Sequence, residues 1–89
     1  MAGSEVVPNV RALGHLIRTR RRALRLTQAE LAARANISRG VLQKLEEGRG
    51  TVTMDSVLRI VSLLSADLVL RDRSAATPPP APGVDLDGL

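Results

Sequence analysis

Apolar residues recur every three or four positions in four successive segments of the chain, which is the spacing of amphipathic helices. The first segment predicts a helix from Val10 to about Leu24, with Leu13 and Ile17 on one apolar stripe. Pro8 and Asn9 precede it and are typical of a helix entrance. Several arginines occupy its other faces, so we expect one side to face a core and another to face water.

Two shorter helices are predicted next, separated by a sharp turn. The second begins at Thr27, where Thr-Gln-Ala-Glu has the form of a capping box, and ends at Asn36, a residue that tolerates the left-handed conformation. The third covers Arg39 to Glu47, between a Ser38 cap and a stop at Gly48. Two short helices joined by a tight turn are typical of a helix-turn-helix.

A fourth helix is predicted from Met54 to Leu64, behind a Thr53 cap, and it is apolar over most of its circumference. Such a helix must bury two sides, and a domain this small covers only one of them. Residues 66–73, ADLVLRDR, then alternate apolar and polar side chains, which is the one strand signal in the sequence. A lone strand needs a partner, most commonly its own copy across a two-fold axis. We therefore predict a homodimer with an interface of Val57, Ile60, Val61, Leu64, Leu68, Val69 and Leu70.

The two ends of the chain differ from this central region. Residues 1–9 are short and irregular, and residues 74–89, SAATPPPAPGVDLDGL, hold four of the five prolines and no basic residue. We predict a flexible N-terminal arm (1–9), one domain (10–73) and a flexible Pro-rich tail (74–89). The tail is either a solubilising extension or a segment that docks on a partner protein.

The basic residues are concentrated in the predicted domain. All 13 of them lie in residues 10–73, against six acidic residues, so this segment carries a formal charge of +7 although the 89-residue chain carries +4. The chain has no Phe, Trp or Tyr, the side chains on which single-strand and RNA-binding modules stack bases. Duplex DNA is therefore the nucleic acid favoured as a partner.

Several classes of protein are disfavoured by what the sequence lacks. The chain has no Cys, and a single histidine, His15, cannot form a zinc site unaided, so we expect no metal and no cofactor. We find no nucleophile and base pair, paired carboxylates or phosphate-binding glycine loop, and an enzyme is the least favoured class. No signal core follows Met1, and no apolar run approaches the roughly 18 residues of a membrane span, so we expect a soluble, cytoplasmic protein.

The stretch LTQAELAARANISRGVLQKLEEG resembles the helix-turn-helix of the Cro and phage-repressor (XRE) family. It matches the Thr-Gln opening, the Leu-Ala pair in the second helix, the Ser cap and the Leu-Glu-x-Gly close. The resemblance covers about Val10 to Leu64 and implies a mainly α, four-helix domain like that of the lambda repressor. The chain departs from the family at Asn36, where glycine is usual, and at Gly40, which lowers helix propensity by roughly 1 kcal/mol relative to alanine.

The strand predicted directly after the fourth helix resembles the HipB-like antitoxins of toxin–antitoxin operons. In those proteins the terminal strands pair across a dimer that represses its own operon and holds a HipA-type kinase toxin inactive. The resemblance therefore implies a DNA-binding repressor that is also an antitoxin. A stand-alone regulator without a toxin, and a module that only neutralises a protein partner, stay open as alternatives.

The same resemblance implies which residues contact DNA. It places Gln28, at the start of the second helix, on a DNA phosphate; the alternative is a solvated glutamine. Arg39 and Lys44 suit guanine O6 and N7, and Gln43 suits adenine or a phosphate, whereas the alternative for each is a solvated side chain. The groove-facing positions are Ser38, Arg39, Gly40, Gln43 and Lys44.

Arg21 and Glu46 match a pair that the family uses as a partly buried ion bridge between the first and third helices. The resemblance therefore implies a structural role for both. The remaining basic residues of this region are expected to divide between phosphate contacts and a solvated face; they are Arg18, Arg20, Arg22 and Arg25.

Overall fold

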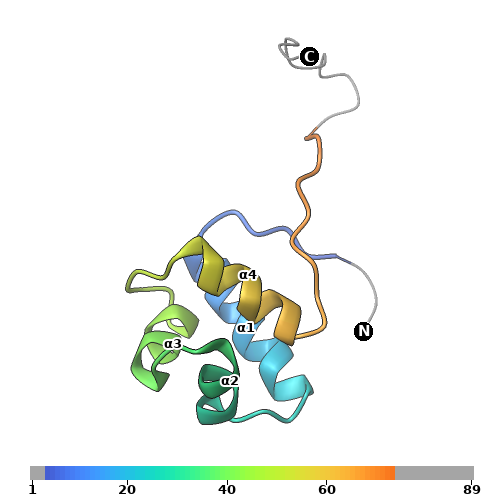
Figure 1. Cartoon of the computed structure of the whole chain (residues 1–89). Coiled ribbons are helices and arrows are strands. Elements are labelled where there is room, and N and C mark those ends of the chain that lie inside the picture. The colour runs from blue at the N-terminus through green and yellow to red at the C-terminus, as the bar shows by residue number, and fades with distance from the viewer. Residues whose placement is uncertain (1–3, 74–89) are drawn as a thin grey trace, which may run out of the picture.

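A computed structural model describes residues 4–73 of the chain, which fold as four helices joined by short turns (Figure 1). The helices are α1 (Val10–Ala23), α2 (Gln28–Ala35), α3 (Arg39–Glu46) and α4 (Met54–Leu63). Helix α3 packs against α1 and α2, and α4 packs against α2. The predicted four-helix arrangement is confirmed, and each helix ends within one residue of its predicted end.

Every helix begins at a side chain that caps its first turn. The side-chain oxygens of Asn9, Thr27, Ser38 and Thr53 each accept a hydrogen bond from the backbone N–H three residues later. At α2 the cap is reciprocal, because Thr27 N–H also donates to the Glu30 carboxylate at 2.8 Å while Glu30 N–H donates to Thr27 Oγ1 at 3.0 Å. The predicted capping box is therefore confirmed.

Two arginines satisfy backbone carbonyls at helix C-termini. Arg59 Nη1 donates to the carbonyl of Ala35, the last residue of α2, at 2.7 Å. Arg20 donates from Nε to the carbonyl of Leu64 and from Nη2 to that of Ser65, both at 3.0 Å, where α4 ends. Positive side chains are favoured at this end of a helix. Arg20 therefore ties α1 to the end of α4, a use that the sequence did not predict.

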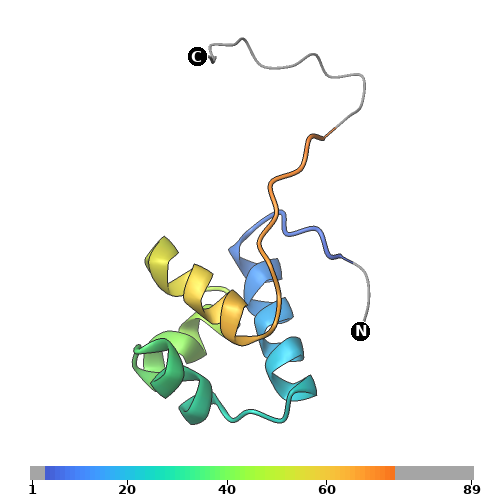
Figure 2. The same ribbon diagram turned by 45° about the vertical axis from the view of Figure 1, so that its right-hand side comes forward.

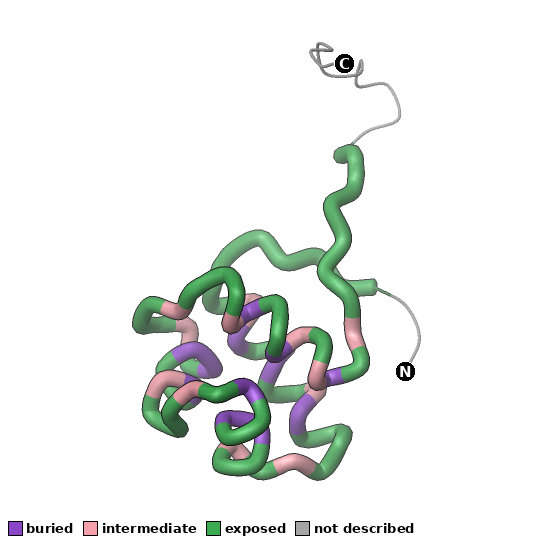
Figure 3. Tube along the Cα trace, in the orientation of Figure 1, coloured by how far each residue is buried: buried purple, intermediate pink, exposed green. Residues whose placement is uncertain are grey.

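The core lies between the four helices and receives one apolar face from each (Figure 3). Because the chain has no aromatic residue, aliphatic side chains fill it entirely. Its buried members are Ile17, Leu31, Ala32, Ala35, Leu42, Leu45, Ile60 and Leu64.

Three residues predicted for a dimer interface lie inside the chain instead. Val57, Ile60 and Leu64 are 8%, 0% and 2% exposed, so they offer almost no surface to a second copy. The sequence predicted these three residues to face a second copy because α4 is apolar nearly all round. Only the packing of α4 against the other helices decides which of its sides is buried inside the chain. The side that α4 turns to water carries the exposed Met54 and Leu58.

Residues 66–73 run away from the helices and form no strand within residues 4–73 (Figures 1 and 2). A strand is defined by hydrogen bonds to a neighbouring strand, and none of the described residues supplies one. The three large apolar residues of this segment, Leu68, Val69 and Leu70, are all more than half exposed. Pairing with a second copy stays a prediction.

The predicted ends of the chain are described only in part. Residues 4–9 are exposed and contain no helix or strand, whereas the tail prediction for 74–89 lies outside the described residues. Among the helices of residues 4–73, none is both long enough and apolar enough to cross a membrane.

Candidate nucleic-acid interface

The turn between α2 and α3 fixes the direction in which α3 leaves the domain. Asn36 adopts the predicted left-handed conformation, with φ of 59°, and the next N–H, of Ile37, donates to the carbonyl of Ala32 at 3.0 Å. Ser38 Oγ then accepts from Val41 N–H at 3.1 Å and starts α3. This turn leaves α3 with one side packed on the domain and the opposite side in water.

The solvent-exposed side of α3 carries polar side chains that make few hydrogen bonds or ion pairs with residues 4–73. Gln43 Nε2 lies 3.5 Å from Glu47 Oε2, at the limit of a hydrogen bond. The side chains of Arg39 and Lys44 make no hydrogen bond or ion pair with any residue in 4–73. The structure brings all five predicted groove-facing positions to exposed sites: Ser38, Arg39, Gly40, Gln43 and Lys44.

Gly40 lies in the first turn of α3 and is not required there by the fold. A Cβ built at this position would meet only Ser38 Oγ, at 4.0 Å. The exposed surface of α3 is therefore bare next to Arg39, with room for another molecule to approach the helix backbone.

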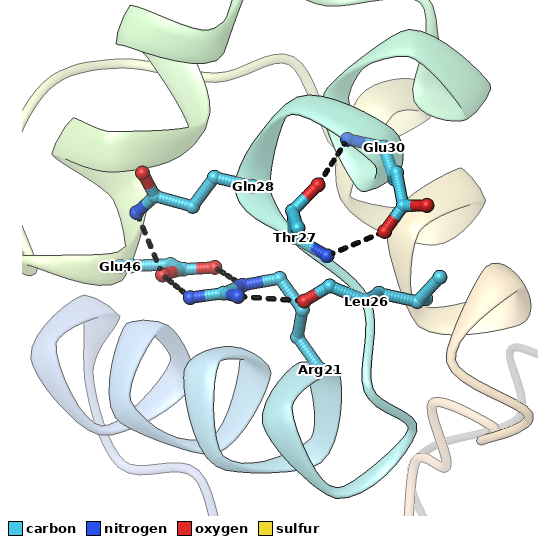
Figure 4. A network of polar contacts seen from close by, with 6 residues as sticks. All are labelled: Arg21, Leu26, Thr27, Gln28, Glu30 and Glu46. Atoms are coloured by element: carbon cyan, nitrogen blue, oxygen red, sulfur yellow. Dashed lines mark hydrogen bonds and ion pairs between the residues drawn. The ribbon is translucent and has the colours of Figure 1, made fainter.

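The C-terminal end of α3, at Glu46, is held by a network of polar contacts, which we call the closed network. Its members are Arg21, Glu46 and Gln28 (Figure 4). Arg21 Nε and Nη2 donate to the two carboxylate oxygens of Glu46 at 2.7 and 3.0 Å, with the side chains 8% and 2% exposed. Arg21 Nη1 also donates to the carbonyl of Leu26 at 2.8 Å. One guanidinium thus joins α1, the α1–α2 turn and α3.

Gln28 contributes to this network in a way that the sequence did not predict. Its Nε2 donates to Glu46 Oε1 at 3.0 Å, so one of its two amide N–H bonds is used inside the protein. The other amide N–H and the backbone N–H are what Gln28 retains for a phosphate. No sequence signal indicates this contact, because Gln28 and Glu46 are 18 residues apart and meet only in the fold.

An open recess of about 390 Å³ lies beside the closed network, where α1, α2 and α3 meet. Its lining includes three arginines of α1 and one from the start of α3, which the sequence had not placed together. The spacing of Arg18 and Arg22, four residues apart, does group these two on one side of the first helix, but no sequence signal brings Arg39 beside them. The full lining is Arg18, Arg21, Arg22, Leu26, Thr27, Gln28 and Arg39.

Two exposed carboxylates near this surface are held in the ionised form. The hydrogen bond from Thr27 N–H keeps the pKa of Glu30 below its ordinary value. The Arg49 guanidinium, which lies 2.8 Å from Glu47 Oε1, lowers the pKa of that carboxyl. Both groups are therefore negatively charged at neutral pH.

The groups exposed on this surface supply positive charge and hydrogen-bond donors. They are guanidinium, ammonium and amide groups, which bind anions and base edges. Within residues 4–73, no group of three or more His, Cys, Asp or Glu residues is placed to hold a metal ion. The arrangement is thus suited to binding a large anion.

Comparison with known proteins gives matches to a protein family and to solved structures. The chain matches a protein family described as "Helix-turn-helix domain" over residues 12–73. It also matches the crystal structure of the clp gene regulator ClgR from Corynebacterium glutamicum, with a TM-score of 0.61 and 33% identity. That match covers 64% of this chain and 61% of the ClgR chain. No curated protein matches the sequence.

Proposed function

This chain belongs to the helix-turn-helix domain family, of the XRE type, and we propose that it is a transcriptional regulator that binds specific sites on double-stranded DNA. One observation carries the proposal: α3, the second helix of the motif, holds a polar, donor-rich side clear of the rest of the domain. In helix-turn-helix proteins the second helix enters the major groove. The ClgR structure, described as a gene regulator, supports the same class of function.

The proposed mechanism divides the interface between groove and backbone. Helix α3 lies in the major groove, and the first turn of α2, at Gln28, meets the sugar-phosphate backbone. The closed network holds the two helices in a fixed relation, which fixes the register of α3 on the base pairs. The proposed contacts on α3 are Ser38, Arg39, Gly40, Gln43 and Lys44.

We further propose that two copies bind DNA together. Leu68, Val69 and Leu70 are exposed on a segment with no strand partner in residues 4–73, and α4 exposes Met54 and Leu58. A second copy would supply both the missing strand and an apolar surface. Two-fold symmetry would then place two α3 helices about 34 Å apart, to bind a near-palindromic site.

A kinase-toxin partner is the second candidate, and the exposed apolar residues 68–70 are the observation in its favour. A second copy of the chain accounts for the same residues, and the matched ClgR structure is described as a gene regulator. The stand-alone regulator is therefore the function we propose. Purification from the native host followed by mass spectrometry separates the two: a co-purifying kinase would replace the stand-alone regulator with an antitoxin.

Selection from a random duplex library tests DNA binding when the target site is not known in advance. We expect the full chain to enrich one near-palindromic sequence and to bind it, by fluorescence anisotropy, more tightly than a scrambled duplex. Lys44→Ala should weaken binding to the selected duplex by about 1–3 kcal/mol and relax the preference at one base pair. The control is His15→Ala, at an exposed position of α1. Equal binding to selected and scrambled duplexes would refute sequence-specific recognition.

Sedimentation equilibrium tests the proposed dimer. We expect the chain to sediment as a dimer and Val69→Asp as a monomer, because a charge at the centre of the paired segments would be buried without a partner. Leu24→Asp, at an exposed apolar residue after α1, is the matched control and should stay dimeric. A wild-type monomer at all concentrations up to those used for DNA binding would contradict the proposal.

A further inference from the structure

The recess beside the closed network gathers arginines from two different helices. Arg18 and Arg22 lie one turn apart on α1, and Arg39 is the first residue of α3. All three line the same hollow and are exposed to water. We call these three residues the arginine recess.

The positive charge of the arginine recess is balanced only in part by the described part of the chain: the Glu47 carboxylate interacts electrostatically with Arg18 but forms no ion pair with it. Arg21 also lines it, but the charge of Arg21 is paired with Glu46. The guanidinium groups of Arg18, Arg22 and Arg39 make no hydrogen bond or ion pair with residues 4–73. Three like charges facing one hollow repel one another unless an anion lies between them. A phosphate, with several acceptor oxygens, matches such a set of donors.

Backbone groups around the recess favour an anion as well. Thr27, the N-cap of α2, and Gln28, its first residue, line it, and so does Arg39, the first residue of α3. The positive ends of two helix dipoles therefore lie at its rim. These dipoles act in addition to the three guanidinium charges.

We propose that the arginine recess holds one phosphate of the DNA backbone, with Arg18, Arg22 and Arg39 as its ligands. This inference rests on the DNA binding proposed above and deepens it. Arg39 then binds the DNA backbone instead of a guanine base, which was the contact expected from the sequence. Base recognition is then left to Lys44, whereas Gln43, four residues from Arg39 and about 40° from it around α3, stays a contact to either a base edge or a phosphate.

The position of Arg39 around α3 supports this division. Arg39 and Glu46 are seven residues apart and so lie on nearly the same face of α3, the face that meets α1 through Arg21. Lys44 is five residues from Arg39, which places the two side chains about 140° apart around the helix. A side chain that faces the α1–α2 corner is thus turned away from the direction of Lys44.

Salt titrations of DNA binding test the inference, using the full chain and the selected duplex. Each phosphate contact contributes about 0.9 to the slope of log K against log salt. We expect Arg39→Gln to reduce the slope by up to about 0.9 for each bound copy, which is about 1.8 for two copies on the near-palindromic site. The variant should weaken binding to the selected and scrambled duplexes by the same factor and leave the preferred sequence unchanged. The double variant Arg18→Gln/Arg22→Gln should likewise reduce the slope without changing the preferred sequence. Matched controls are Arg11→Gln and Arg34→Gln, exposed arginines outside the recess, which should keep the wild-type slope.

Neutral methylphosphonates placed one at a time in the selected duplex locate the phosphate. We expect a methylphosphonate at one position per half-site to lower the affinity of the wild-type chain about tenfold. The same duplex should lower the affinity of the Arg18→Gln/Arg22→Gln variant less than about twofold, because the methylphosphonate and the arginine substitutions remove the same interaction. Unchanged melting temperatures show that the variants fold.

The outcomes separate this inference from the proposed function. If the wild-type chain selects no duplex, the proposed function fails. If it selects one but the recess variants keep the wild-type slope, or the methylphosphonate and arginine effects multiply independently, only the arginine recess is refuted. A change of preferred base at one position in Arg39→Gln, with an unchanged slope, would return Arg39 to base recognition.

Discussion

The closed network and the arginine recess lie side by side and both use arginines of α1, but the arginine of the network is buried and paired, whereas those of the recess are exposed and unpaired within residues 4–73. In the network, the Arg21 guanidinium is buried and its carboxylate partner, Glu46, is 2% exposed. In the recess, Arg22 is the next residue along the chain, and it is exposed without an ion pair in residues 4–73. One residue turns a helix by about 100°, which is enough to separate an arginine of the fold from an arginine of the surface.

Because of this difference in burial and pairing, substitutions in the closed network and in the arginine recess should affect different properties of the protein. Removing Arg21 or Glu46 from the closed network leaves a buried charge without its partner, and the loss is in folding. Removing a member of the arginine recess relieves repulsion between like charges, and the loss is in binding. The substitutions below test how strictly this separation holds.

The largest effect is expected at Gly14, where α1 touches α3 next to the closed network. A Cβ at this position would overlap the carbonyl oxygen of Leu45 and lie 3.0 Å from that of Glu46. Backbone atoms cannot move aside like a side chain, so Gly14→Ala should destabilise the chain by about 3 kcal/mol or more. Urea unfolding at fixed protein concentration measures this. A wild-type midpoint for Gly14→Ala would show that α1 and α3 can separate without cost, and the network would then not fix α3.

A somewhat smaller loss is expected from Glu46→Ala. Arg21 would remain buried without its carboxylate, and Gln28 would lose its acceptor, so we expect a loss of about 3 kcal/mol in the free energy of unfolding. Glu47→Ala, one residue further, is the matched control, because Glu47 is exposed and its contacts with Arg49 and Gln43 are exposed as well. Little change is expected there. Equal losses for the two glutamates would remove the distinction between buried and exposed pairs.

The sequence predicted well what depends on nearby residues. The caps at Thr27 and Ser38, and the left-handed turn at Asn36, involve partners within three or four positions, so the local pattern was sufficient. The bounds of the four helices followed from the same local signals.

The errors arose where distant segments meet. The sequence showed that α4 is apolar all round but not which side would be buried, and it placed Ile60 and Leu64 outward. It identified Gln28 and Glu46 separately but not the hydrogen bond between them. Gly14 was visible only as a weak helix former, because the carbonyl that requires it belongs to α3. The arginine recess likewise exists only once α3 brings Arg39 to α1.

Gly40→Ala tests the exposed side of α3, because a Cβ at Gly40, unlike one at Gly14 of α1, would contact no other helix. A methyl group there has open space, so the substitution should stabilise the fold by about 1 kcal/mol, the helix-propensity difference between the two residues. If α3 enters the groove as proposed, the same methyl group should weaken binding to the selected duplex. Urea unfolding and anisotropy measure the two effects separately. Destabilisation by Gly40→Ala would mean that the fold itself requires a glycine on this side.

The smallest effect is expected at the capping box, which borders both regions, because Thr27 lines the recess and the next residue, Gln28, belongs to the network. The Glu30 pKa is lowered chiefly by the Thr27 N–H that donates to its carboxylate. A lowered carboxyl pKa adds stability that is complete above the ordinary pKa of roughly 4.3 and is lost as the pH falls through the lowered value.

Glu30→Gln keeps a side-chain acceptor for Thr27 N–H but removes the charge, so the acid-dependent part of this stability should disappear. We expect the free energy of unfolding to depend less steeply on pH below about pH 5 in Glu30→Gln than in the wild-type chain. Glu5→Gln, on the exposed arm outside the helices, is the control for removing one carboxylate. Identical pH profiles for the wild type and Glu30→Gln would mean that the hydrogen bonds of the cap, and not its charge, start α2. The position of α2, and with it the geometry of the closed network and of the arginine recess, would then not change with pH.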